Sequence, residues 1–313
     1  MKVGSKVLLG LALAWATPGA AQTTDEMVCW DEVDIHTAEE QLAACETVLR
    51  SDTLSDEDRP YVIAMKGWSN HELGRLDDAL TFYTEKIRLQ PDIADGYGWR
   101  ASVYFDQMDY ARAIDDFSAA IRLGVDSVDQ QFWYHDRAMA RHYAGDSAGG
   151  LEDMSYAIEL NDADSVNWHD RANIYHDIGD HEHALADYTR AINLAPDDPY
   201  NWNSRCWTRA VWDRQLVEAL DDCNEAIAID GSDYNFWDSR GLVYLRMERW
   251  EDAASDYDAS LSLEETASAH YGHGIALQKL GNEQEAEAAF TAALRMDPKI
   301  AETYAGYGIE PGS

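Results

Sequence analysis

A repeating pattern of about 34 residues runs through most of this chain and constrains its fold more than any other feature. Three positions recur at this interval, two of them mostly small and one mostly large and apolar. The small residues are Gly67, Ala101, Ala138, Ala172, Cys206, Gly241 and Gly274, then Ala79, Ala113, Gly150, Ala184, Ala219, Ala253 and Ala286; the third set is Tyr83, Phe117, Met154, Tyr188, Cys223, Tyr257 and Phe290. Small residues that meet large ones at fixed places predict two closely packed helices in every repeat.

Glycine and proline mark where these helices are expected to stop. They fall in the middle of some repeats or at the ends of others: Gly74, Gly145, Gly179 and Gly281, and Pro91, Pro196 and Pro298. Each repeat is therefore predicted to contain a first and a second short helix. Because one helix pair cannot bury its apolar face alone, neighbouring repeats are expected to stack.

An aromatic residue near the fourth place of five repeats completes the pattern: Tyr97, Tyr134, Trp168, Trp202 and Trp237. With the small eighth residue, the alanine at the twentieth place and the occasional final proline, the chain resembles the tetratricopeptide repeat family, in its secreted bacterial form. The resemblance implies an all-α fold, a right-handed superhelical solenoid of antiparallel helix pairs. Repeats one to seven are expected over residues 60–93, 94–127, 131–164, 165–198, 199–233, 234–266 and 267–300.

The segments that flank the repeats are expected to cover the ends of the stack. Residues 22–59 are predicted to form an N-terminal half-repeat, and residues 301–313 a partial helix and tail that resembles the start of an eighth first helix. Residues 1–21 resemble a signal peptide, because Lys2 and Lys6 precede the apolar run 7–16 and small residues stand at Gly19 and Ala21. We expect cleavage near Ala21, a periplasmic or secreted protein, and no membrane insertion afterwards.

The charge of the chain argues against several classes of partner. It has 24 basic and 59 acidic residues, a formal net charge of −35. Nucleic acid and anionic membrane surfaces would be repelled, so neither is expected to bind. The 46% apolar content, with 11 Trp and 17 Tyr, nevertheless predicts a packed core instead of a disordered acidic chain.

The four cysteines occupy equivalent places in two helix pairs. Cys206 and Cys223 take the small and the large position of repeat five, and Cys29 and Cys45 are 16 residues apart. A solenoid brings only neighbouring repeats together, so we expect disulfides Cys29–Cys45 and Cys206–Cys223. Export would permit their oxidation.

Five repeats carry an arginine in the first helix and an aspartate 16 or 17 residues later in the second. They are Arg100 with Asp116, Arg137 with Asp153, Arg171 with Asp187, Arg205 with Asp222 and Arg240 with Asp256. The first and seventh repeats lack both partners and have Lys66 with Phe82 and His273 with Ala289. We interpret the arginines as members of structural ion pairs, in preference to anion ligands.

In the family that this chain resembles, certain residues of the first helices line a concave groove that binds peptides or partner helices. The corresponding residues here are Tyr61, Trp68, His71, Phe105, Asp106, Phe132, His135, Met139, His142, Tyr143, His169, Asn173, His176, Asp177, Tyr200, Asn203 and Trp207. This aromatic lining favours a protein or peptide partner, with a merely solvated polar face as the alternative. The clustered histidines also predict that ligand binding in the groove depends on pH. Only Arg246 and Lys279 offer a positive charge to a carboxylate there.

The groove histidines raise a second possibility, a metal or haem carrier. His135 and His142 are seven residues apart, as are His169 and His176, and seven helical residues span about 10.5 Å. Two imidazoles on one zinc ion must each lie about 2 Å from it, so neither pair chelates alone. Only a site across repeats, such as His142 with His169 or His176, is conceivable. We therefore expect no cofactor and no metal site.

No enzyme signature stands out. The chain has no HExxH, GxSxG or phosphate-binding glycine motif, and nearly all of it is assigned to repeats. Acidic residues between repeats, such as Asp198 and Asp233, are interpreted as helix caps. The sequence thus predicts a non-catalytic, exported scaffold for protein interactions, with the metal or haem carrier as the alternative.

Overall fold

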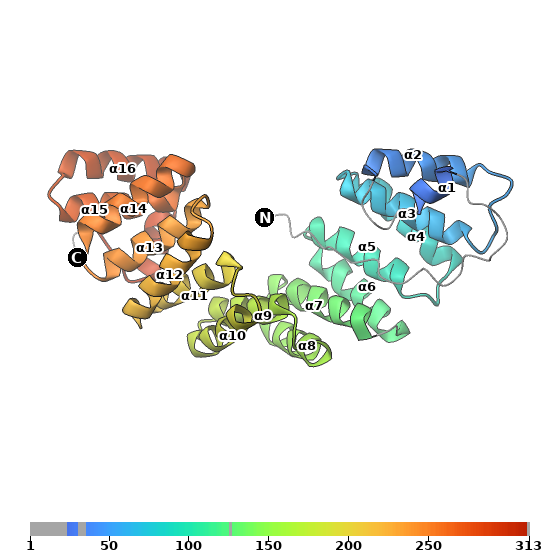
Figure 1. Cartoon of the computed structure of the whole chain (residues 1–313), viewed down its shortest axis with the longest axis horizontal. Helices are drawn as coiled ribbons and strands as arrows, with labels where there is room; N and C mark the ends of the chain where they lie inside the picture. Colours follow the sequence, from blue (N-terminus) through green and yellow to red (C-terminus); the bar gives the residue numbers. More distant parts are fainter. Residues whose placement is uncertain (1–23, 31–35, 125–126, 312–313) are drawn as a thin grey trace. The chain divides into compact units, whose positions relative to one another are not determined.

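The computed structural model describes residues 24–30, 36–124 and 127–311. Within these ranges it contains seventeen α-helices and no strand, so the all-α prediction is confirmed. The predicted signal peptide lies outside the described residues. The helices form two compact units, one ending at Asn161 and the other beginning at Asp162. Inside each unit, consecutive helices run back and forth beside one another (Figure 1).

In its described residues, the N-terminal unit contains eight helices. They are α1 (Thr24–Cys29), α2 (Ala38–Leu49), α3 (Arg59–Glu72), α4 (Leu76–Leu89), α5 (Asp95–Asp106), α6 (Tyr110–Leu123), α7 (Ser127–Tyr143) and α8 (Ser147–Leu160). The helices α3, α5 and α7 are first helices of repeats, and α4, α6 and α8 are second helices. Here α3 contacts α5, and α5 contacts α7, while each of these first helices also contacts the second helix of its own repeat.

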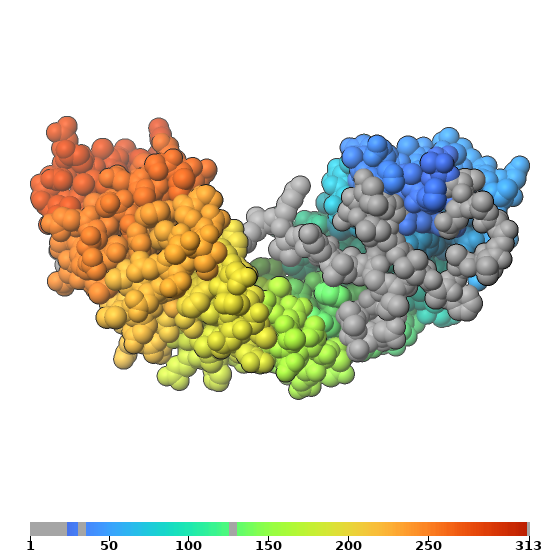
Figure 2. All heavy atoms as spheres, viewed as in Figure 1, coloured from blue at the N-terminus to red at the C-terminus, as the bar shows by residue number. Residues whose placement is uncertain are grey.

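The C-terminal unit, which is described as far as Pro311, contains nine helices there. They are α9 (Ser165–Asp177), α10 (His181–Leu194), α11 (Pro199–Trp212), α12 (Leu216–Ile229), α13 (Tyr234–Arg246), α14 (Trp250–Leu263), α15 (Ala267–Lys279), α16 (Glu283–Met296) and α17 (Ile300–Gly306). The first helices here are α9, α11, α13 and α15. On the face shown in Figure 2, the successive repeats of this unit, coloured yellow to red, pack without gaps.

Aspartates begin several of these helices. Side chains of Asp146 and Asp180 accept hydrogen bonds from backbone N–H groups at the starts of α8 and α10, and Asp198 and Asp233 do the same for α11 and α13. The first N–H groups of a helix have no partner inside it, and a carboxylate there also interacts favourably with the helix dipole. The interpretation of Asp198 and Asp233 as caps is confirmed.

The turns between the two helices of a repeat require a left-handed backbone. The predicted turn glycines have positive φ values of 70° to 90°: Gly74, Gly145, Gly179 and Gly281. In repeats two and six, Met108 and Glu248 adopt the same conformation, with φ values of 59° and 55°. This region is unfavourable for residues with a Cβ, so the geometry of the turn overrides the preference of these two side chains.

The small and large positions meet inside each helix pair. A Cβ atom added to Gly67 would lie 2.6 Å from the Tyr83 ring, and one added to Gly241 would lie 2.9 Å from the Tyr257 ring. Both tyrosines are fully buried. The predicted contact between small and large residues is therefore part of the core of the repeat, and a larger residue at these glycines would force the tyrosine ring or its helix to move.

Both predicted disulfides are present. Cys29 on α1 is bonded to Cys45 on α2, with 4.7 Å between the Cα atoms. Cys206 on α11 is bonded to Cys223 on α12, with a Cα separation of 5.5 Å. All four cysteines are buried, and each bridge joins two helices that are adjacent in sequence.

The last helix, α17, differs from the expected start of an eighth repeat. It makes few contacts with α16. Tyr304 of α17 packs on α15, and Tyr307, directly after the helix, packs on α11. The physical reason is that Tyr304 and Tyr307 find aromatic partners there. No helix in the described part of the chain has both the length and the apolar character needed to cross a bilayer.

Candidate functional site

The predicted groove residues all lie on first helices, but the structure divides them between the two units. Those from Tyr61 to Tyr143 belong to α3, α5 and α7, and those from His169 to Trp207 belong to α9 and α11. Most are half-buried. Tyr143 and Tyr200 are the most open of the fifteen aromatic, histidine, methionine and asparagine residues, with 49% and 50% exposure.

Three of the five groove histidines connect neighbouring first helices. His71 Nε2 lies 2.7 Å from Asp106 Oδ2, which joins α3 to α5. On α9, His169 Nδ1 lies 2.7 Å from Asn201 Oδ1, and His176 Nδ1 lies 2.9 Å from Thr208 Oγ1, which joins α9 to α11. These histidines therefore brace one repeat against the next.

The other two histidines have local hydrogen-bond partners. His142 Nδ1 lies 3.0 Å from Ser147 Oγ at the start of the second helix of its own repeat, and His135 Nδ1 lies 3.0 Å from the adjacent Asp136. No group of three or more His, Cys, Asp or Glu side chains in the described residues is arranged to hold a metal ion. Nothing in these contacts favours the metal or haem carrier.

Burial sets the electrostatics of the histidines in the C-terminal unit. Desolvation lowers the pKa of His176, while Asp177 acts in the opposite direction. Desolvation also lowers the pKa of His181, whose ring lies 5.6 Å from that of His176 and 5.6 Å from that of Trp212. Both imidazoles are therefore neutral near pH 7.

An aromatic cluster joins the ends of three helices of the N-terminal unit. Its members are Phe105 at the end of α5, Tyr110 at the start of α6 and Tyr143 at the end of α7. The ring centroids are 5.6 Å apart for Phe105 and Tyr110, 6.0 Å for Phe105 and Tyr143, and 5.6 Å for Tyr110 and Tyr143. The nearby Met108, in the turn between α5 and α6, is 74% exposed. We call Phe105, Tyr110 and Tyr143 the aromatic cluster.

The five Arg–Asp pairs form as the sequence spacing predicts. In each pair, the arginine Nε and Nη2 donate to the two carboxylate oxygens, as Arg100 does to Asp116 over 2.7 and 2.9 Å. The others are Arg137 with Asp153, Arg171 with Asp187, Arg205 with Asp222 and Arg240 with Asp256. The hydrogen bond to Asp116 raises the pKa of Arg100 further above its usual range.

A second role of these arginines was missed from the sequence. Nη1 of Arg100 donates to Thr84, that of Arg137 to Ser118, that of Arg205 to Thr189 and that of Arg240 to Asn224, over 2.8 to 3.2 Å. Each acceptor belongs to the second helix of the preceding repeat. The signal was a polar residue two positions after the place that holds the aspartate, which is Phe82 in repeat one. The contacts show that the arginine connects repeats as well as helices.

The aromatic residues at the fourth place also have a structural role. The guanidinium of Arg171 lies 4.9 Å from the Trp168 ring, and that of Arg240 lies 4.9 Å from the Trp237 ring. In addition, Trp168 Nε1 donates to the backbone carbonyl of Asp162 over 3.0 Å. Each of these rings thus covers an ion pair and fixes the loop between repeats.

The end repeats replace the ion pair with other contacts. Lys66 Nζ lies 4.5 Å from the centre of the Phe82 ring and 3.5 Å from Glu46 Oε1. His273 Nε2 lies 3.4 Å from Asp258 Oδ1. Repeat one therefore keeps a cation in the first helix and exchanges the carboxylate for an aromatic face.

Residues 300–309, which we call the C-terminal segment, lie on the first helices of the C-terminal unit. The Tyr307 ring packs edge to face on Trp207, a predicted groove residue, at 5.6 Å. Arg246 Nη2 donates to the Tyr307 carbonyl. Two residues that were expected to bind a partner are thus in contact with the chain's own segment.

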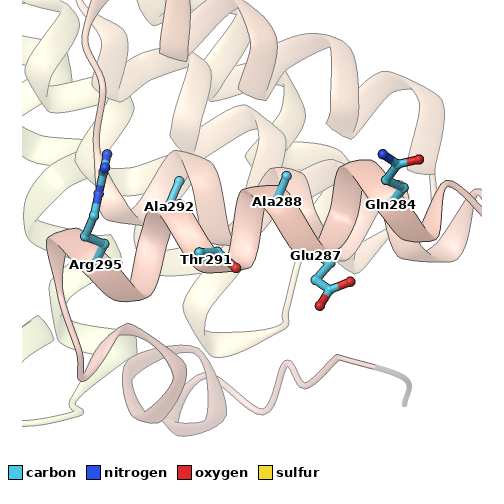
Figure 3. A pocket seen from close by; sticks show the side chains of 6 residues that line it. All are labelled: Gln284, Glu287, Ala288, Thr291, Ala292 and Arg295. Carbon is cyan, nitrogen blue, oxygen red and sulfur yellow. The ribbon is translucent and has the colours of Figure 1, made fainter.

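A shallow hollow runs along α16 in the same unit. Its lining residues are Gln284, Glu287, Ala288, Thr291, Ala292 and Arg295. In Figure 3, Gln284, Ala288 and Ala292 project from one edge of the helix and Glu287 from the other. All six residues come from one helix, and none of them is buried. Since ligand sites are usually concave and have polar groups that converge from several elements, we assign this surface no function.

Comparison with known families settles the classification. Family models for the tetratricopeptide repeat match residues 65–127, 166–198 and 239–299, together half of the chain. The chain belongs to the tetratricopeptide repeat family. Its sequence is 32% identical over 84 residues to human tetratricopeptide repeat protein 28, a match that covers 26% of this chain and 3% of that protein. The chain thus corresponds to a small part of that relative.

Solved structures support the same fold for this tetratricopeptide repeat chain. A tetratricopeptide repeat protein from Parabacteroides merdae superposes with a TM-score of 0.59 at 14% identity, over 82% of this chain and 92% of that one. A chain of the APC/C hetero-tetramer Cut9–Hcn1 gives a TM-score of 0.56 at 15% identity, over 86% of this chain and 51% of that one. At these identities the likeness concerns the fold, and the predicted solenoid of helix pairs is confirmed.

Proposed function

We propose that this protein is a non-catalytic scaffold that binds a protein or peptide partner, and that the aromatic cluster of the N-terminal unit is part of its contact surface. The observation that carries the proposal is the arrangement of Phe105, Tyr110 and Tyr143. Three rings from three helices lie within 6.0 Å of one another, and Tyr143 remains 49% exposed. Rigid aromatic side chains grouped on a surface are typical of protein contact sites.

The helices on either side support this proposal because they hold the rings in place. His142 lies 5.4 Å from Tyr143, ring to ring, and is itself hydrogen-bonded to Ser147. Phe105 and Tyr110 flank the tight turn at Met108. A surface whose side chains are already fixed loses little conformational entropy on binding, which favours affinity.

Export is the second part of the proposal. It is supported by the signal-like pattern in residues 1–21 and by the two buried disulfides, which persist in oxidising compartments. We propose a periplasmic or secreted location. Intact mass measured on the protein purified from its native host, without reductant, tests both points. A chain that starts at Gln22 and takes up no alkylating reagent is expected, whereas free thiols or retained residues 1–21 would contradict export.

Variants of the aromatic cluster test the interaction surface. Affinity capture from the native cell envelope is compared for the wild type and for Tyr143→Ser. Tyr156→Ser serves as a matched control, because Tyr156 on α8 is 42% exposed and lies outside the cluster. We expect the same partner with the wild type and the control, and at least a tenfold loss with Tyr143→Ser. Equal capture of the partner by all three proteins would show that the aromatic cluster is not part of the contact surface.

The alternative of a metal or haem carrier has no observation in its favour. The five groove histidines are engaged in hydrogen bonds with neighbouring side chains, and no suitable group of three ligands occurs in the described ranges. We therefore develop only the scaffold.

A further inference from the structure

The C-terminal segment takes a place that the other helices of the C-terminal unit do not. In complete repeats, a first helix packs against the second helix of the repeat before it, as α15 does against α14. By contrast, α17 makes few contacts with α16, and the segment reaches α15, α13 and α11. It therefore crosses three first helices, which is where a bound peptide would lie.

Two tyrosines anchor the segment. Tyr304, which is 1% exposed, lies 4.8 Å from the Tyr271 ring, and its hydroxyl donates to the Ser268 carbonyl over 2.9 Å. Tyr307 packs edge to face on Trp207 at 5.6 Å. The two anchors are three residues apart, so a single face of one short helix presents both of them.

A buried guanidinium supplies the polar contact. The side chain of Arg246 is 9% exposed, and its nearest carboxylate oxygen, on Asp213, is 3.9 Å away. It donates instead to backbone carbonyls, that of Tyr307 and, over 3.0 Å, that of Ala210. Because hydrogen bonds between two charged groups are stronger than those to a neutral carbonyl, an incoming carboxylate would be a better partner than Tyr307.

The segment is held by one face of α17, whose buried residues are Ile300 and Tyr304. Its helix is seven residues long, too short to be stable without packing. Glu302, Thr303, Ala305 and Gly306 are exposed, so only one face contributes. Beneath Tyr304, Asp238 receives one hydrogen bond from Ser268, and its Oδ1 has no hydrogen-bond partner in the described residues. An unsatisfied buried carboxylate oxygen opposes the docked arrangement.

We propose that the first helices α11, α13 and α15 form a second binding surface, which accepts a short helical peptide with two aromatic residues three positions apart, and that the C-terminal segment occupies this surface until such a peptide displaces it. This inference rests on the proposed scaffold function and specifies a partner for the C-terminal unit. The partner's aromatic side chains would take the places of Tyr304 and Tyr307. A carboxylate near its second aromatic residue would pair with Arg246.

A labelled copy of the segment itself is the probe. A fluorescein-labelled peptide of residues 297–309 is titrated with the full chain, and binding is followed by fluorescence anisotropy. Wild-type protein is expected to bind weakly, because its own segment competes. The full-chain variant Tyr307→Ser, in which that segment is loosened, is expected to bind the peptide at least tenfold more tightly. Adding Trp207→Ala should remove this gain.

A peptide in which alanine replaces both tyrosines is the matched control and should not bind. Absence of saturable binding to a folded Tyr307→Ser protein would overturn the proposal. So would equal binding of the control peptide.

Hydrogen exchange of the wild-type protein tests whether the C-terminal segment can leave its surface, even if Tyr307→Ser does not fold. Amides of Tyr304 to Tyr307 are expected to exchange at least tenfold faster than those of α13, because the segment opens while the repeats stay folded. Exchange of the segment and α13 at one common rate would identify the segment as a permanent part of the fold and exclude displacement.

These outcomes are independent of the aromatic cluster. Loss of partner capture by Tyr143→Ser tests the N-terminal unit, whereas peptide binding tests the C-terminal unit with a defined probe. Failure of the peptide experiment alone would remove the second surface and leave the scaffold function standing.

Discussion

Cys206 and Cys223 are bonded one residue along each helix from the ion pair between Arg205 and Asp222. Repeat five therefore joins its two helices covalently and electrostatically at the same level. Replacing the bridge by Cys206→Ala and Cys223→Val is expected to lower the free energy of unfolding by about 3 kcal/mol, chiefly because the unfolded chain loses a constraint. Urea unfolding measures the change.

The bridge Cys29–Cys45 stays intact in that double variant and serves as the internal reference. Reductant would break both bridges, so the variant isolates one. An unchanged urea midpoint would show that the ion pair alone holds α11 to α12. A loss well beyond the expected value would indicate that the ion pair fails when the disulfide is removed.

Removing one partner of a buried ion pair should cost more than removing both. In repeat six, the side chains of Arg240 and Asp256 are 16% and 6% exposed. Asp256→Ala leaves the guanidinium without its carboxylate and is expected to destabilise the protein by about 3 kcal/mol. The double variant Arg240→Met and Asp256→Leu should lose less. Thermal and urea unfolding compare them, and an equal loss would contradict a net cost of the unpaired charge.

Asp238 predicts a pH dependence of the docked C-terminal segment. Burial raises the pKa of its carboxyl from 3.8 to about 6, while the hydrogen bond from Ser268 acts in the opposite direction. The titratable groups that face it are Tyr257 of α14 and Tyr304 and Tyr307 of the segment. Since the folded pKa is raised, the folded state holds the proton more tightly, and this contribution to stability is lost as pH rises through about 6.

Asp238→Asn should therefore stabilise the segment at pH 7, with little gain at pH 4. Hydrogen exchange of the amides in α17, measured at both pH values and corrected for intrinsic rates, provides the test. Equal protection in wild type and variant at pH 7 would show that the carboxylate is solvated when ionised. Asp221→Asn, which changes an exposed carboxylate on α12, is the control.

His176 predicts the opposite dependence. Burial lowers its pKa, so the folded state binds this proton less readily than the unfolded state. Its contribution is complete above the unfolded pKa of about 6.5 and is lost as pH falls below it. Between pH 7.5 and 5, His176→Gln should lose less stability than the wild type in urea unfolding. An equal loss of stability in the wild type and in His176→Gln would contradict a cost of protonating the buried imidazole.

The contacts that occupy equivalent positions in the repeats could be predicted from the sequence. The contact between Gly241 and Tyr257, the pairing of Arg240 with Asp256 and the bridge from Cys206 to Cys223 all follow from equivalent positions in seven copies. The repeats can be compared with one another. Two positions that carry their paired residues in the same repeats, and lack them in the same repeats, are predicted to be in contact.

Contacts that do not occur at equivalent positions of several repeats could not be predicted in this way. His71, His169 and His176 were expected to face a partner, but each is bound to a neighbouring first helix through a different residue type, namely Asp106, Asn201 and Thr208. No fixed pattern marks such a contact. The C-terminal segment occurs once, and its packing on Trp207 depends on tertiary geometry that no repeat position records.

The arginines that reach back to the preceding repeat have a consequence for how the units unfold. In a linear array, the free energy is a sum of terms for single repeats and terms for the interfaces between neighbours. Arg137 and Arg205 contribute to both terms at once, because each joins its own aspartate and also Ser118 or Thr189 of the repeat before it. Melting one repeat therefore weakens its neighbour, so each unit should lose its helices in steps longer than a single repeat.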